Sequence, residues 1–245
     1  MTEAEWLGCD DPLPMLAFLR GRASDRKLRL LACAFCRLIW HWMLDVTSRM
    51  AVETAERYAD GLASDKQLGE IANSAWSVNP GEFDVAPALK SFPYAAAEAA
   101  GAVTYRDSNL MVIPGGPPQE KAARSALQDA AEAVLSIGGS DNPDGTLDAD
   151  EDQQFRGRVC GLIRCVIGNP LRPRTLDTSW QTSNDATAPR LAETIYDYRD
   201  FERLPVLADA LEDTGCNNVE ILDHCRNGGE HARGCWVLDL LLGKQ

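Results

Sequence analysis

The chain has 245 residues, of which 45% are hydrophobic, and its formal net charge is -13. This length and composition suit one large or two small domains with a buried core, which excludes disorder throughout. The negative charge repels phosphate backbones and anionic lipids, so we expect neither a nucleic acid nor a membrane as a partner. One basic cluster lacks interleaved aromatic residues, and we interpret it as the solvated start of a helix: Arg20, Arg22, Arg26, Lys27 and Arg29.

Residues 1–77 carry repeated signals for the start of a helix. The apolar run 28–44 has hydrophobic residues on almost every side, which predicts a buried central helix. Gly61 is placed to end the helix expected over 50–60. Four polar residues stand where an N-cap is expected, each ahead of an apolar periodic segment: Asp11, Ser24, Ser48 and Ser64.

Residues 78–118 form a Pro- and Gly-rich middle segment in which helical periodicity weakens. Apolar residues at 109–113 favour one short strand, although the sequence offers no partner strand for it. We expect an irregular excursion here.

Residues 119–245 return to helical periodicity. Apolar spacing predicts helices over 118–137 and 148–167, with a polar loop at 172–187. Four shorter helices with tight loops follow, and such loops favour antiparallel packing: 188–198, 201–213, 218–226 and 230–242. We therefore predict an all-α fold, a multi-helix bundle in which residues 1–77 and 119–245 share one core.

The N-terminal residues Met1 to Trp6 are acidic and lack the basic and apolar regions of a secretory signal. No stretch reaches the roughly 18 uninterrupted apolar residues of a membrane span. We expect a cytoplasmic protein whose eight cysteines are reduced.

Cysteine and histidine residues gather toward the C-terminus. His231 and Cys235 are four residues apart, which places them on one face of the expected helix 230–242. Thiolates and imidazoles are the ligands that tetrahedral zinc prefers, so a structural zinc site is one interpretation. Its ligands would be Cys36, Cys225, His231 and Cys235. The alternative is that these thiols are core residues and the histidines hydrogen-bonded ones.

The segment Cys33 to Cys36 is a C-x-x-C, but it lies inside an apolar helix. A redox-active C-x-x-C sits at a helix N-terminus, where the helix dipole lowers the thiol pKa. A thioredoxin-like role is therefore disfavoured.

Residues 140–151 match part of a calcium-binding loop, with Asp144, Gly145, Asp148 and Glu151 at template positions. Ser140 replaces the first aspartate, Pro143 stiffens the segment, and no second loop is present to pair with it. We interpret 140–151 as an acidic loop rather than a calcium site.

Catalytic motifs are scarce in this sequence. It has no Gly-x-Ser-x-Gly elbow, no phosphate-binding glycine loop and no His-Glu-x-x-His motif. A dyad of His231 with Cys225 or Cys235 is the remaining enzyme hypothesis. We do not expect a catalytic protein.

Several segments at the two ends of the chain form a recognisable set: 5–16 (from EWL to PML), 23–30 (ASDRKLRL), 36–41 (CRLIWH), 55–61 (AERYADG), 168–170 (GNP), 204–213 (LPVLADALED), 221–226 (ILDHCR) and 234–244 (GCWVLDLLLGK). Together they resemble an uncharacterised family of planctomycete-type bacterial proteins. Phe35 departs from the family pattern, which often has Cys at this position.

The resemblance implies a bacterial cytosolic protein and brings no activity. Similar C-terminal segments are attached to otherwise different proteins, which suits a docking module. We therefore expect a non-catalytic protein-interaction or scaffolding module with a protein partner, bound near Trp180 or Trp236. The alternatives are a helical zinc protein and an enzyme with a Cys/His site.

Overall fold

The computed structural model describes residues 1–75, 77, 127–135, 149–172, 186–227 and 229–244. Regular secondary structure in these residues is all helical, which confirms the predicted all-α class. The chain packs as two compact units. The middle unit is Cys9–Cys160, and the terminal unit combines Met1–Gly8 with Gly161–Gln245. These boundaries differ from those that composition predicts at 77 and 118, and the single shared core stays a prediction.

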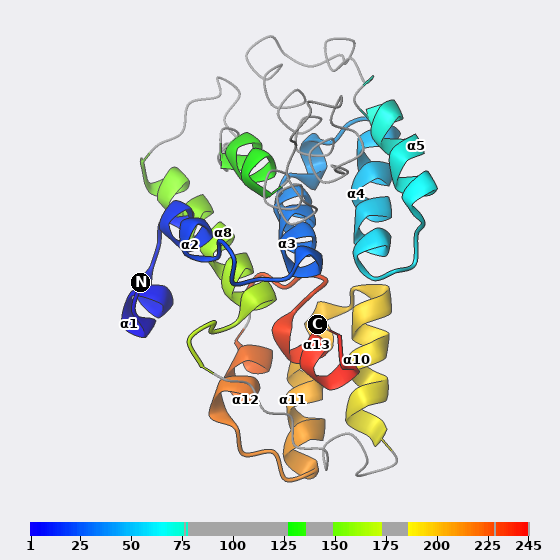
Figure 1. The fold of residues 1–245 in the computed structure, drawn as a ribbon. Helices are drawn as coiled ribbons and strands as arrows, with labels where there is room; N and C mark the ends of the chain where they lie inside the picture. The colour runs from blue at the N-terminus through cyan, green and yellow to red at the C-terminus, as the bar shows by residue number, and fades with distance from the viewer. Residues whose placement is uncertain (76, 78–126, 136–148, 173–185, 228, 245) are drawn as a thin grey trace. The chain divides into compact units, whose positions relative to one another are not determined.

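The middle unit is built around an antiparallel run of helices (Figure 1). Helix α4 packs between α3 and α5. A further helical segment covers residues 127–135, and the first part of α8 also belongs to this unit. The bounds of its elements are α2 (Pro12–Phe18), α3 (Asp25–Leu38), the 3-10 helix η1 (Trp40–Trp42), α4 (Val46–Ala59), α5 (Asp65–Ala75) and α8 (Ala149–Ile167).

Side-chain caps fix where these helices begin. Asp11 accepts a hydrogen bond from the Leu13 amide, and Ser24 accepts one from the Lys27 amide, as predicted for N-cap residues. The Ser64 hydroxyl likewise accepts from the Gln67 amide. The start predicted at Ser48 is wrong. Asp45 is the N-cap of α4, because its carboxylate accepts from the Ser48 amide at 2.6 Å.

The central buried helix is shorter than the predicted run 28–44. Helix α3 ends at Leu38, and Ile39 leaves the helical conformation with φ -105° and ψ 22°. The chain then turns through η1, where the Arg37 guanidinium lies 3.9 Å from the Trp40 ring centroid. Arg49, from the next helix, donates to the Met43 carbonyl at 2.7 Å. These contacts favour a chain reversal over another helical turn.

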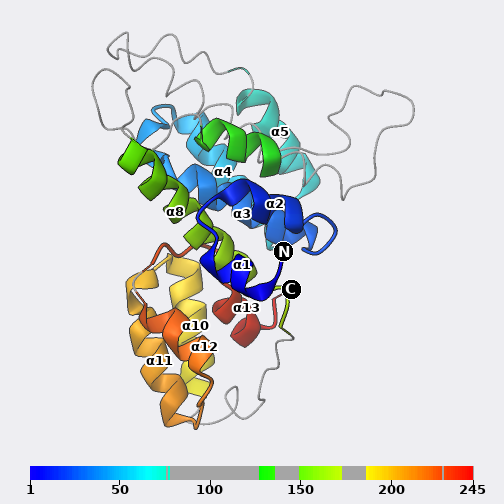
Figure 2. The same ribbon diagram turned by 90° about the vertical axis from the view of Figure 1, so that its left-hand side faces the viewer.

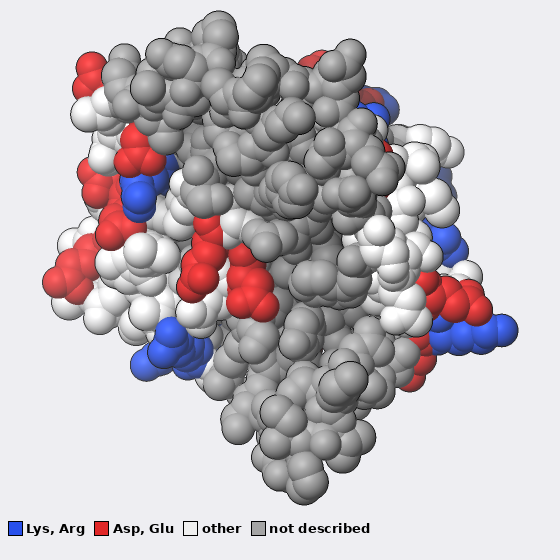
Figure 3. Space-filling view, turned by 90° about the horizontal axis from the view of Figure 1, so that it is seen from above, with Lys and Arg blue, Asp and Glu red and all other residues white. Residues whose placement is uncertain are grey.

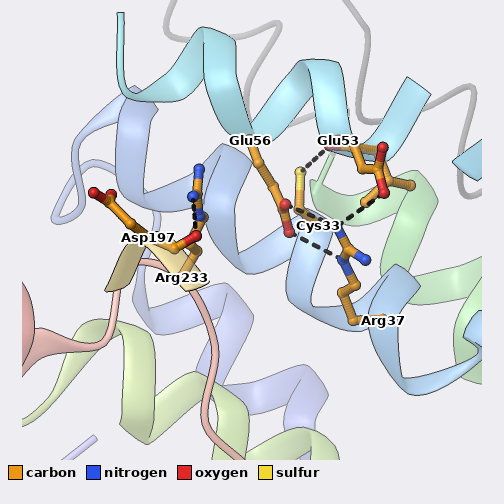
Figure 4. Close-up of polar contacts among 7 residues, drawn as sticks. Cys33, Arg37, Glu53, Glu56, Asp197 and Arg233 are labelled. Carbon is orange, nitrogen blue, oxygen red and sulfur yellow. Dashed lines mark hydrogen bonds and ion pairs between the residues drawn. The ribbon is translucent and has the colours of Figure 1, made fainter. Parts of the chain in front are cut away.

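An ion pair joins α3 to α4 inside the middle unit (Figure 4). Arg37 donates to both carboxylate oxygens of Glu56, at 3.2 Å from Nε and 2.9 Å from Nη2. Glu56 is only 4% exposed, and the Arg37 guanidinium offsets the free-energy cost of burying its negative charge. Glu53 approaches the same guanidinium at 4.0 Å from an exposed position. Arg37 therefore has one buried carboxylate partner, Glu56, and one exposed carboxylate neighbour, Glu53.

The terminal unit is a second helical cluster, in which α11 packs against both α10 and α12, and α10 also packs against α13 (Figure 2). Its core is formed by apolar side chains of these four helices together with Cys165, Cys216, Cys225 and Cys235. The element bounds are α1 (Glu3–Gly8), α10 (Thr187–Tyr198), the 3-10 helix η6 (Phe201–Arg203), α11 (Leu204–Asp213), α12 (Val219–Arg226) and α13 (Trp236–Leu242).

The first helix belongs to the terminal unit although the sequence places it beside residues 9–77. Trp6 is fully buried, and its indole nitrogen donates to the Gly168 carbonyl at 3.0 Å. Arg164 donates to the Trp6 carbonyl at 3.2 Å, and Asn169 donates to the Glu3 carboxylate at 2.7 Å. Helix α1 is thereby fastened to the C-terminal end of α8.

Several predicted features lie outside the described residues. These are the middle segment 78–118 with its strand at 109–113, residues 140–148 of the calcium-loop match, and Trp180. Within the described part of the chain, no helix has the length and apolar character needed to cross a membrane.

Replacing Glu56 with Gln should destabilise the middle unit by about 1–2 kcal/mol, because a buried partner of Arg37 loses its charge. The matched control is Glu53→Gln, which should change the free energy of unfolding by less than about 0.5 kcal/mol because Glu53 is exposed. Urea denaturation of the full chain followed by circular dichroism measures both. Equal effects of the two variants would contradict the assignment of Glu56 as the buried partner.

Candidate metal centre

Two cysteines and two histidines of the terminal unit converge in space. One ligand atom from each of Cys165, His224, His231 and Cys235 lies within 4.8 Å of the other three. The two cysteines are buried, and the two histidines are partly buried. Thiol and imidazole groups gathered this closely form a Cys2His2 set that can hold a metal ion.

Cys165 comes from the last turn of α8. The helix ends at Ile167, and Gly168 takes a left-handed conformation (φ 67°) from which its amide donates to the Arg164 carbonyl at 2.7 Å. The hydrogen bond from Trp6 to the Gly168 carbonyl holds this turn in place. Cys165 is 2% exposed. Its thiol therefore lies buried at a helix end that hydrogen bonds to Arg164 and Trp6 hold in place.

His224 comes from α12. Asn218 caps this short helix, because its side-chain oxygen accepts from the amides of Glu220 and Ile221. Ile221, Leu222 and Cys225 are buried and anchor the helix to the core. The cap fixes where α12 begins, and the buried residues fix which face of α12 meets the core. Together they set the position of the His224 imidazole.

His231 and Cys235 come from the segment that joins α12 to α13, which corrects the predicted helix 230–242. Helix α13 begins at Trp236, and Cys235 is its N-cap. The Cys235 amide donates to the Ala232 carbonyl at 3.0 Å, which closes a turn through Gly234 (φ 82°). Only glycine adopts such a φ readily. The turn, rather than a helix, therefore brings Cys235 back toward His231.

Arg233 ties this segment to α10. Its Nη2 donates to the Asp197 carbonyl at 3.3 Å, and its guanidinium carbon lies 5.2 Å from the Tyr196 ring centroid. Figure 4 shows the Arg233 contact with Asp197. The segment carrying two of the four candidate ligands is thus held by contacts that do not involve a metal.

Two distances within the cluster are close to the edges of a zinc tetrahedron. Zn–S bonds of about 2.3 Å and Zn–N bonds of about 2.0–2.1 Å place neighbouring sulfur and nitrogen ligands about 3.6 Å apart. Cys165 Sγ lies 3.5 Å from His231 Nδ1, and Cys235 Sγ lies 3.2 Å from His224 Nε2. These two sulfur–nitrogen pairs are therefore already near the spacing that one ion requires.

Aromatic packing orients the two imidazoles. The His224 and His231 rings meet edge to face, with centroids 5.0 Å apart and an interplanar angle of 89°. Trp236 packs on His224 at 5.4 Å between centroids, and Phe201 lies 6.4 Å from His231. Packing of this kind around ligands limits their rotation and so keeps their nitrogen atoms directed at the site.

The cluster favours a thiolate at Cys235. Burial alone raises the pKa of this thiol. Hydrogen bonding with Cys165, together with the charge of His224 and hydrogen bonds with both histidines, outweighs burial and holds the Cys235 pKa well below its ordinary value. A thiolate is the form of cysteine that binds metal.

The structure brings together two of the four ligands predicted from the sequence, His231 and Cys235. Cys225 lies near Cys235 but outside the set of four, and burial and the neighbouring Cys235 raise its pKa. Cys36 lies in α3 of the middle unit, where burial and the Glu56 carboxylate raise its pKa. Both are buried thiols that resist the deprotonation that a metal ligand needs.

Sequence reasoning missed Cys165 and His224 as members of the set. His224 and Cys225 are adjacent in the sequence, and only the rotation of α12 decides that the imidazole faces Cys235. Cys165 is separated from the other three by α10 and α11, so no local spacing indicates it. The spacing of His231 and Cys235 pointed to this region, and the histidine beside Cys225 was a second local signal that could have added His224.

The other sites considered from the sequence gain little support. In the basic cluster, Arg26 pairs with Asp60 at 2.8 Å, Arg29 is 7% exposed, and Arg22 lies 4.5 Å from the Phe18 ring centroid. Acidic and basic side chains both occur among the described residues on the face shown in Figure 3. Of the calcium-loop match, the described residues are the first of helix α8, including Glu151.

Replacing Cys235 with Ser should weaken zinc binding by more than about 100-fold, because a ligand is lost rather than an outer contact. The matched control is Cys225→Ser, a buried thiol next to the site, which should change zinc affinity by less than about tenfold. Competition with a chromogenic chelator measures both affinities. If Cys225→Ser lost zinc as strongly as Cys235→Ser, the assignment of the four ligands would be wrong.

Comparison of the chain with protein-family models, with curated proteins and with solved structures finds no match. The resemblance of its two ends to a planctomycete-type family stays an expectation. The function of this chain is therefore argued from the geometry of the Cys/His cluster.

Proposed function

We propose that this protein is a helical zinc protein whose Cys2His2 site stabilises the terminal unit. The observation that carries the proposal is the convergence of Cys165, His224, His231 and Cys235 within 4.8 Å of one another. Zinc is the metal that mixed thiolate and imidazole sets favour in tetrahedral geometry.

The number of ligands favours a structural role. Catalytic zinc sites keep one position open for water or substrate, and they use three protein ligands. Here four protein groups of the correct types are available, so a bound ion would be fully coordinated by the chain. Two of the four groups are the buried thiols of Cys165 and Cys235.

The same contacts argue against a cysteine-based enzyme. Two Cys–His pairs lie within reach of a hydrogen bond, as a nucleophile and its base would. However, Cys235 is 0% exposed and Cys165 is 2% exposed, so neither sulfur is presented to an organic substrate. A metal ion requires no such exposure, since its ligands surround it.

Zinc would connect parts of the terminal unit that are distant in the sequence. The candidate ligands come from the end of α8, from α12, from the segment before α13 and from the N-cap of α13. A bound ion acts as a cross-link among these elements, and its binding free energy adds to the stability of the folded state. The effect should be largest where irregular backbone carries the ligands, at 229–235.

The interaction module expected from the sequence stays a prediction. Trp236, near which we expected a partner to bind, is 5% exposed and packs against His224. It therefore supports the candidate metal site rather than a surface contact, and Trp180 lies outside the described residues.

Elemental analysis of the full chain, produced with zinc in the medium, should find about one zinc per molecule. Removing the metal with a chelator should lower the stability of the terminal unit by about 4 kcal/mol relative to protein kept at a zinc concentration about 1,000 times its Kd. Thermal unfolding with and without added zinc measures this difference.

The matched control is the Cys235→Ser variant. Because its zinc affinity should fall by more than about 100-fold, the same zinc concentration should stabilise it by less than about 1.4 kcal/mol, against about 4 kcal/mol for the wild-type protein. Wild-type protein that binds no zinc after reconstitution, or whose unfolding is the same with and without chelator, would contradict the proposal.

A further inference from the structure

We propose that Cys165 and Cys235 form a peroxide-sensitive pair, in which oxidation joins the two sulfur atoms as a disulfide and releases the metal. This inference rests on the proposed zinc site and names its regulation. It begins from the composition of the cluster, in which two cysteine sulfurs share one small space with two imidazoles.

The two sulfurs are close enough to react with each other. Their atoms lie within the 4.8 Å cluster, and the Cys165 side chain hydrogen-bonds that of Cys235. A disulfide needs a sulfur–sulfur distance of about 2.05 Å. Cys235 follows the turn through Gly234 and precedes the first residue of α13, so a modest shift of this irregular segment can close the remaining gap.

A hollow whose wall includes one of the four candidate ligands is large enough to admit a small oxidant. The hollow has a volume of about 220 Å³, and its walls include Phe201, Pro205, Cys225 and His231. His231 is therefore both a wall of the hollow and a candidate ligand. Hydrogen peroxide is small enough to enter a space of this size, which brings it to the His231 side of the cluster; Cys165 and Cys235 are buried behind this wall.

The reaction balances with hydrogen peroxide as the oxidant. The Cys235 sulfur attacks one peroxide oxygen, the O–O bond breaks, and a sulfenic acid and one water form after protonation. The Cys165 sulfur then attacks the Cys235 sulfur and displaces its hydroxyl group as a second water. In total, two thiolates, one hydrogen peroxide and two protons give one disulfide and two waters, with two electrons passing from sulfur to oxygen.

Loss of both thiolates removes half of the zinc ligands. The remaining imidazoles of His224 and His231 are too few for a closed tetrahedral site, so the ion leaves. The cross-link among α8, α12 and α13 then changes from a four-ligand metal site to a bond between the end of α8 and the start of α13.

Two other thiols make the assignment testable. Cys225 and Cys216 are buried in the same core, and Cys225 interacts electrostatically with both Cys216 and Cys235. If proximity in the core alone decided the pairing, Cys225 would compete for Cys235. If the proposal is correct, Cys235 pairs with Cys165, because both belong to the same set of four converging groups.

The experiment treats zinc-loaded full-length protein with hydrogen peroxide. A chromogenic chelator follows zinc release, and mass spectrometry of non-reduced peptides maps the disulfide. We expect one zinc released per Cys165–Cys235 disulfide, in wild-type protein and in the Cys225→Ser control alike. A reductant should restore both thiols and zinc binding.

A Cys225–Cys235 disulfide, a sulfinic acid at Cys235 without a disulfide, or retention of zinc under peroxide would each overturn this inference. Retention of zinc leaves the proposed zinc site intact and contradicts only its regulation. Protein that holds no zinc before peroxide is added contradicts the proposed function itself.

Discussion

The terminal unit depends on the convergence of two thiols and two imidazoles at one point. Cys165 and His231 approach within 3.5 Å, and His224 and Cys235 within 3.2 Å, although α10 and α11 separate the first residue from the other three in the chain. The four groups already lie in pairs at hydrogen-bonding distance, and a single cation held between them would contact all four at once. The fixed end of α8, the capped helix α12 and the turn at Gly234 each position one part of this set.

Local contacts fix helices in both units, and the terminal unit adds contacts between distant parts of the chain. In the middle unit, Asp45 and Ser64 cap the helices that follow them, and the Arg37–Glu56 ion pair joins α3 to α4. In the terminal unit, Trp6 reaches Gly168 from the other end of the chain, and the Cys/His cluster joins elements that are far apart. A metal ion bound there would join elements that are distant in the sequence, and its binding free energy would add to the stability of the folded state.

Periodicity and capping chemistry predicted the local structure well. Apolar spacing predicted the helical class and α3, and Asp11 and Ser24 cap helices as expected. We predicted that Ser48 caps the helix that became α4, whereas Asp45 is its N-cap. Both side chains can accept a hydrogen bond, so the sequence alone does not distinguish them. It also extended the last helix back to residue 230. The positive φ of Gly234 breaks that helix, and apolar spacing does not reveal it.

The site was harder to predict than the fold. The region and half of the ligand set followed from the sequence, because His231 and Cys235 are near each other in the chain. Cys165 and the choice of His224 over Cys225 depend on tertiary packing, which no local spacing encodes.

The most direct test of the zinc site is X-ray absorption spectroscopy of the zinc-loaded protein. We predict two sulfur ligands at about 2.3 Å and two nitrogen ligands at about 2.0–2.1 Å; a shell of oxygen and nitrogen without sulfur would contradict it.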